Sequence, residues 1–193
     1  MCIIGQMAAQ AGWKEFAPVV AAALDSKYCG GKTDRMALLR PLARLAQPGD
    51  AQIAEANRKS LAMEYPYMLV EAAHLAGVLG DRQAIPRLRE LLDHPFLAVR
   101  RSAAVALGRL KDTASAARLR ESLVRIRKRE VLDHVKYGTE IRCDENMRAA
   151  AARALALMAD KASLPALKRA AAGEPVPWVR EEMARAIRAI GEP

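Results

Sequence analysis

Aromatic residues are scarce in this 193-residue sequence, at 4% of the chain, and cysteine occurs only three times. Cys2, Cys29 and Cys143 are odd in number, widely separated and never in a CxxC pair. This usage argues against a disulfide framework and predicts a reducing, cytoplasmic setting. No apolar run of about 18 residues is present, so the sequence predicts no membrane-spanning helix. The apolar residues 1–13 lack the basic flank of a signal peptide.

Alternation of β-branched and polar residues, the pattern of a half-buried strand, is also rare. The chain is instead rich in helix-forming residues, since hydrophobic residues make up 52% of it and many of them are alanine. We therefore expect an all-α protein. The net charge of +9 suits an anionic partner, either nucleic acid or the acidic face of a protein, and it equally suits a solvated basic surface.

Aspartates recur along the chain at a regular interval. Asp50, Asp81 and Asp112 are 31 positions apart, and Asp160 follows after a longer interval. Each of them ends a similar short sequence, namely PGD, LGD, LKD and MAD. We expect each aspartate to cap the N-terminus of a helix, because a carboxylate accepts hydrogen bonds from the free amides of the first turn.

Two helical segments follow the aspartates and align between units. The first segment is found at 81–92 and 160–171, and the second at 99–110, 147–158 and 179–190. In both segments the apolar residues fall on one side of a helix. Neither helix of a pair can bury that side alone, so we expect helix pairs to stack and to share a continuous core, as in an α-solenoid.

Residues 99–112 follow the pattern VRxxAAxALGxLxD, which resembles the HEAT repeats, in particular the short HEAT-like units first described in phycobilisome lyases. The resemblance is most specific in residues 81–112 and 147–192 and weaker in 13–80. It implies an α-α superhelix, that is, a right-handed α-solenoid of about five helical hairpins with an incomplete first one. It also implies a single domain over residues 1–193, in which the second helices line a concave face that binds another macromolecule.

The resemblance further implies a structural ladder between neighbouring repeats. Its members would be three aspartates and three arginines that share one slot of the second helix, namely Asp81, Asp112 and Asp160 and Arg100, Arg148 and Arg180. Their recurrence in each unit indicates a structural role, because a catalytic residue is rarely needed once per repeat.

The repeat is interrupted by one insertion. Asp81 and Arg100 are 19 positions apart, whereas Asp112 and Arg148 are 36 apart, so 17 extra residues fall within 124–146. The basic residues at its start are Arg125, Arg127, Lys128 and Arg129. Insertions in repeat proteins lie on one face, often the binding face. One interpretation is a basic projection that binds a partner, and the other is a lengthened first helix followed by a solvated loop.

The spacing of the second helices predicts which side chains line the concave face. Those predicted to bind a partner there are His74, Arg101, Arg109, Arg153, Arg185 and Arg188. We predict a non-enzymatic scaffold that binds a protein with an acidic surface through this face and the basic insertion. Residues 2–7 align with 105–110, so an apolar end without its first helix could also support end-to-end self-association.

Two alternatives remain open. A nucleic-acid-binding HEAT-like protein would suit the charge, but the chain has few aromatic side chains on which bases could stack. A subunit of a bilin-lyase-like enzyme would suit the resemblance, although such repeats occur in proteins of many functions. HEAT-like iron hydroxylases use His-Glu pairs, whereas His74, His94 and His134 are followed by Leu, Pro and Val. We therefore predict no catalytic, cofactor-binding or metal-binding residues.

Overall fold

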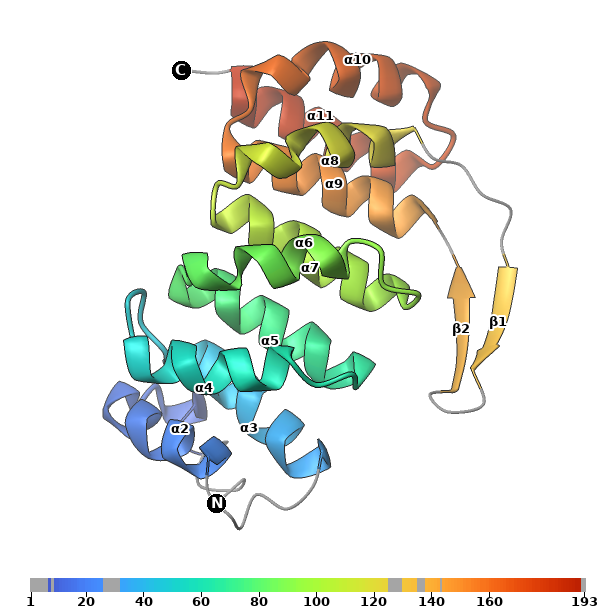
Figure 1. Ribbon diagram of the computed structural model, residues 1–193. Helices are drawn as coiled ribbons and strands as arrows, with labels where there is room; N and C mark the ends of the chain where they lie inside the picture. Colours follow the sequence, from blue (N-terminus) through green and yellow to red (C-terminus); the bar gives the residue numbers. More distant parts are fainter. Residues whose placement is uncertain are drawn as a thin grey trace. The chain divides into compact units, whose positions relative to one another are not determined.

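The computed structural model describes the chain except for residues 1–6, 8, 26–31, 125–129, 135–137, 143 and 192–193. It divides into two compact units, residues 1–87 and 88–193, coloured from blue to green and from green to red (Figure 1). The single domain expected from the sequence stays a prediction, and each unit is described separately.

Unit 1 consists of stacked helix pairs. Its elements are the short 3-10 turn η1 (Lys14–Phe16) and the helices α2 (Ala17–Asp25), α3 (Lys32–Leu45), α4 (Ala51–Leu61) and α5 (Pro66–Leu79). Helix α2 packs against α3 and α4, and α5 packs against the same two helices. Leucines such as Leu39, Leu42 and Leu69 are completely buried between them. The pairs therefore share one core, as the apolar spacing predicts.

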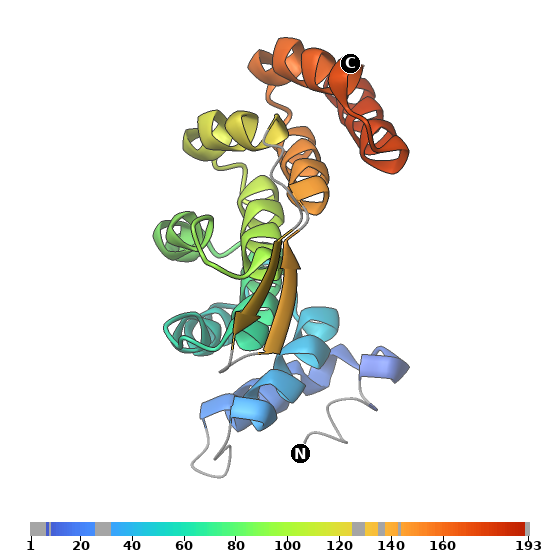
Figure 2. The same cartoon turned by 90° about the vertical axis from the view of Figure 1, so that its right-hand side faces the viewer.

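Unit 2 continues the pattern of helix pairs. Its helices are α7 (Leu97–Arg109), α8 (Ala116–Leu123), α9 (Asp144–Met158), α10 (Leu164–Gly173) and α11 (Pro177–Gly191), and α6 (Ile85–Leu91) spans the boundary between the units. The second helices α7, α9 and α11 pack side by side, and α8 and α10 form the other layer. Figure 2 shows α8 (yellow) and α9 (orange) side by side, one from each layer. The all-α repeat fold is thus confirmed.

The recurring aspartates stand where the sequence predicts, at the N-cap positions of first helices. Asp50 precedes α4, and the other three precede the 3-10 turns η2 (Arg82–Ala84), η3 (Thr113–Ser115) and η4 (Lys161–Ser163). Only Asp81 makes the expected cap, since its Oδ1 accepts from the amide of Gln83 at 3.1 Å. The carboxylates at the start of η3 and η4 accept from side chains instead.

Helices α7 and α9 approach each other closely at small residues. A Cβ placed on Gly108 would lie 2.7 Å from the Cα and 2.9 Å from the carbonyl oxygen of Ala154. The alanines 149–152 of α9 are buried as well. Small side chains therefore allow the second helices to pack almost backbone to backbone.

The insertion contains two paired strands. One of the two interpretations of the sequence was a lengthened first helix in this region. Helix α8 ends at Leu123, and β1 (Glu130–His134) pairs in antiparallel fashion with β2 (Gly138–Arg142), with Glu130 opposite Arg142. The helix interpretation is wrong for these residues. Val131, Thr139 and Ile141 are β-branched and favour strands. Arg125, Arg127, Lys128 and Arg129 lie outside the described residues.

The described helices contain no candidate membrane span, since none of them is both long and apolar enough to cross a bilayer.

Candidate protein-binding site

The recurring aspartates form a ladder, but with different arginines from those expected. The pairs are Arg58 Nη1 with Asp81 Oδ2, Arg89 Nε with Asp112 Oδ2 and Arg120 Nη1 with Asp160 Oδ2, each at 2.9 Å. Each arginine lies on the first helix that precedes its aspartate, α4, α6 or α8. The partners are 23, 23 and 40 positions apart, so the insertion lengthens the last interval without breaking the pattern.

Serine hydroxyls complete two of these pairs. Ser115 donates to Asp112, and Ser163 donates to Asp160. Asp112 and both serines are buried. The hydrogen bond to Asp112 raises the pKa of Arg89 above its ordinary value. The ladder is therefore a set of structural contacts, and its carboxylates are engaged with the protein itself.

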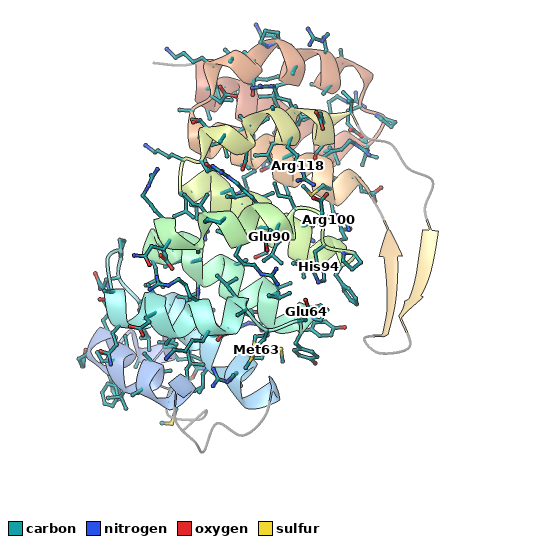
Figure 3. The ribbon with its side chains drawn as sticks, viewed as in Figure 1. Met63, Glu64, Glu90, His94, Arg100 and Arg118 are labelled. Carbon is teal, nitrogen blue, oxygen red and sulfur yellow. The ribbon has the colours of Figure 1, made fainter. Side chains whose placement is uncertain are left out.

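The arginines of the second-helix slot face the turns that precede second helices. Arg100 Nη1 donates to the carbonyl oxygens of His94 and Pro95, both at 2.7 Å, and Figure 3 shows its side chain close to that of His94. Arg148 makes a bidentate pair with Glu174, through Nε at 2.6 Å and Nη2 at 2.7 Å. We expected the arginines of this slot to pair with the capping aspartates. Arg100 and Arg148 instead contact the turns before second helices, and the expectation is corrected.

Glu174 is a buried acid held in its charged form. Burial raises the pKa of its carboxyl group, but hydrogen bonds from Arg148 and from the Val176 amide, together with the charges of Arg148 and Arg180, outweigh burial. The pKa therefore lies below its ordinary value. Only 4% of the Arg148 side chain and 2% of the Glu174 side chain are exposed, so this pair lies within the protein.

The predicted binding residues of unit 2 lie on its second helices. We define the second-helix face as the outward side of α7, α9 and α11 around Arg101, Arg109, Arg153, Arg185 and Arg188. Arg109 is half-buried and the other four are exposed. Because the three helices are neighbours in one layer, the structure brings these arginines to one face, as the repeat spacing predicts.

Arg109 and Arg153 are adjacent across the contact between α7 and α9. Arg109 follows Gly108 and Arg153 precedes Ala154, the two residues at which the helices meet. Burial lowers the pKa of Arg109, and the positive charge of Arg153 lowers it further. Two cations are therefore held close together on this part of the face.

Acidic residues are distributed unevenly over the second-helix face. Helix α7 contains no Asp or Glu, and the acidic residues of α9 are confined to its first two positions. On α11, in contrast, Arg185 pairs with Glu181 and Glu182, each at 3.3 Å, and Arg188 approaches Glu181 at 3.9 Å. On this face, α11 therefore provides carboxylates within reach of the predicted arginines.

His74 and the other histidines show no shared site in the described part of the chain. His74 is half-buried on α5 of unit 1, whereas the predicted arginines belong to unit 2. His94 Nδ1 accepts from the amide of Phe96 at 3.1 Å in the turn before α7. Among the described residues, no group of three or more His, Cys, Asp or Glu side chains is arranged to hold a metal ion.

The family model for HEAT repeats matches residues 54–135 and 139–193, well over half of the chain. The chain belongs to the HEAT-repeat family. The resemblance seen in the sequence pattern is therefore confirmed. No curated protein matches the chain significantly.

Solved HEAT-repeat structures are similar to this chain in fold. A chain in the complex of CpcE and CpcF of phycocyanin lyase from Nostoc sp. PCC7120 matches with a TM-score of 0.68 and 22% identity over 92% of this chain. Human deoxyhypusine hydroxylase, solved in complex with glycerol, matches with a TM-score of 0.55 and 19% identity over 98% of this chain. The match spans 65% of the lyase-subunit chain and 67% of the hydroxylase chain. At these identities the likeness shows a shared fold.

Proposed function

We propose that this HEAT-repeat protein is a non-enzymatic scaffold that binds a protein with an acidic surface through the second-helix face of unit 2. The observation that carries the proposal is the concentration of Arg101, Arg109 and Arg153 on α7 and α9, where acidic residues occur only at the start of α9. A surface of one charge attracts a partner of the opposite charge and orients it during encounter.

Two further observations support a protein partner. The phycocyanin-lyase structure that resembles this chain is a complex of CpcE with CpcF, so a similar repeat fold takes part in a protein assembly there. The family fold also presents several helices side by side, which suits the broad contact areas of protein interfaces. The basic residues at the start of the insertion and end-to-end association would add contacts to the one proposed here.

A nucleic-acid partner is the alternative that the charge suggests. Single-stranded nucleic acids are usually bound by stacking of their bases on aromatic side chains. Among the residues of α7, α9 and α11, Trp178 is the one aromatic residue. A duplex bound through its phosphates would show affinity that falls steeply with salt concentration. The same experiment can therefore include both classes of partner.

Site-specific photo-crosslinking in cells of the native source tests the proposal. A crosslinking amino acid in place of Val105, which lies between Arg101 and Arg109 on α7, should capture a protein. The same substitution at Ala117, an exposed residue of α8 in the other layer, is the matched control. Capture at Val105 that disappears when Arg101 and Arg153 are changed to Glu supports the proposal. Capture of nucleic acid, or equal capture from both positions, contradicts it.

A further inference from the structure

We propose that the α4–α5 helix pair of unit 1 opens locally while the core of unit 2 stays folded. The inference concerns the stability of the first repeats and does not depend on the proposed binding face. It rests on two fully buried polar residues of α4, Asn57 and Ser60, and on the residues that stand at the same positions in other repeats.

Asn57 stands at a position that leucine occupies in the other first helices. It follows the aspartate at the N-terminus of its repeat, Asp50, by seven positions. The same position in α6, α8 and α10 is held by completely buried leucines, namely Leu88, Leu119 and Leu167. A buried leucine stabilises a repeat because its apolar surface leaves water, whereas burial of an amide is favourable only when its polar atoms are hydrogen-bonded.

The amide of Asn57 uses only part of its hydrogen-bonding capacity. Its Nδ2 donates to the carbonyl oxygen of Ala72 in α5 at 2.9 Å. Its Oδ1 and the Oγ of Ser60 are buried and have no hydrogen-bond partner among the described residues. A buried polar atom loses its hydrogen bonds to water on folding and regains them when the segment opens. Both oxygens therefore favour the open form of α4.

Unit 2 contains no such oxygen in its described part. The buried side-chain atoms that lack a partner in the described chain are these two oxygens and Arg35 Nη1, all of them in unit 1. In unit 2 the buried hydroxyls of Ser115 and Ser163 donate to aspartates, and Arg148 holds Glu174 through two hydrogen bonds. The polar groups in the core of unit 2 are therefore paired, and that core should open at a higher free energy than α4.

Helix α3 contributes a second feature that lowers the stability of unit 1. Pro41 is buried inside this helix, and proline has no N–H to donate to the carbonyl one turn earlier. Helix α5 packs against both α3 and α4. Each of its two neighbours thus lacks hydrogen bonds that the other repeats make. Local opening starts where such features are concentrated, so we expect it at α4 and α5.

Native-state hydrogen exchange of the full chain, followed by mass spectrometry, tests the inference. The protection of amides in α4 and α5 is compared with that of amides in α7 and α9. The unit 1 variants are Asn57→Leu, which introduces the leucine of the other repeats, and Ser60→Ala, which adds no volume. The matched variant in unit 2 is Leu119→Asn, which places an amide at the corresponding position of α8.

In the original protein, the amides of α4 and α5 should exchange about tenfold or more faster than those of α7 and α9. Asn57→Leu and Ser60→Ala should each slow exchange in α4 and α5 about tenfold, because each removes a buried oxygen without a partner. Neither variant should change exchange in α7 and α9. Leu119→Asn should accelerate exchange in α8 and α9 and leave α4 and α5 unchanged. If Leu119→Asn does not fold, the two unit 1 variants still test the inference.

Two results would overturn the inference. Protection of α4 and α5 that equals or exceeds that of α7 and α9 would show that unit 1 does not open first. Unchanged or faster exchange of α4 and α5 in both Asn57→Leu and Ser60→Ala would show that the two oxygens are hydrogen-bonded in solution. In that case these residues do not weaken unit 1.

Discussion

Two sets of arginines in unit 2 have the same chemistry and very different surroundings. Arg89 and Arg120 on first helices donate to Asp112 and Asp160, which the fold places next to them. Arg153 on a second helix instead lies beside another arginine. The comparison shows that the net charge of +9 says little about binding by itself. The fold decides which arginines are held by carboxylates of the protein itself.

The pair of Arg148 and Glu174 is the most deeply buried of the arginine–carboxylate pairs in unit 2. Its loss should lower the stability of the protein more than any other change considered below. Arg148→Met leaves the Glu174 carboxylate buried without its partner, so we expect the free energy of unfolding to fall by about 3–5 kcal/mol. Urea unfolding measures the change. The double variant Arg148→Met/Glu174→Leu should recover most of the loss, and equal losses in both variants would contradict this role.

A substitution at Gly108 tests the close contact between α7 and α9, the helices that carry Arg109 and Arg153. In Gly108→Ala the new Cβ would meet the backbone of Ala154, which cannot move aside easily, so we expect a loss of about 3 kcal/mol. Thermal unfolding measures it. Gly173→Ala is the control, because nothing lies within 4 Å of a Cβ at that position. Similar melting temperatures for both variants would show that the close contact is absent.

Asp112 tests the ladder itself. Asp112→Ala removes the acceptor of Arg89 and of Ser115 at a buried position, and we expect a loss of about 2 kcal/mol. Urea unfolding again provides the measurement. Glu121→Ala on the exposed side of α8 is the control and should change stability little. A loss no larger than that of the control would mean that the ladder does not stabilise unit 2.

Acid should weaken the pair of Arg148 and Glu174. The pKa of Glu174 is lower in the folded protein than in the unfolded chain, so its charged form stabilises the fold above its ordinary pKa of 4.5. This contribution should be lost as the pH falls from there through the folded pKa. Unfolding of the original protein and of Glu174→Gln, measured across this range, should converge at low pH. A constant difference would contradict the assignment.

Arg153→Gln should have the smallest effect on stability. The residue is exposed and close to Arg109, so its removal should change the free energy of unfolding by less than about 0.5 kcal/mol. At low salt the variant should be slightly the more stable, because repulsion between the two arginines is lost. Urea unfolding at two salt concentrations checks both statements, and a clear loss of stability would assign Arg153 to the structural set.

The arginine–aspartate pairs show which part of the structure the sequence predicts and which part it does not. The aspartates and their recurrence were recognisable, and three of their arginine partners, Arg58, Arg89 and Arg120, also recur every 31 positions. That second series is a usable signal, but Arg100, Arg148 and Arg180 also share one repeat slot, so recurrence alone does not select the partners of the aspartates. The repeat spacing did place Arg109 and Arg153 on one face. It gave no distance between them, since that distance depends on the residues at the α7–α9 contact.

The sequence by itself determined the paired helices, their layers and the capping positions of the aspartates. Helical periodicity and capping act within a few residues, so a single sequence contains the information for both. Tertiary structure decided that Asp160 pairs with Arg120 across 40 positions, that Glu174 receives Arg148, and that the insertion pairs as two strands. These contacts form only when the helices pack against one another. They join residues that are far apart in the chain, so no short stretch of sequence predicts them.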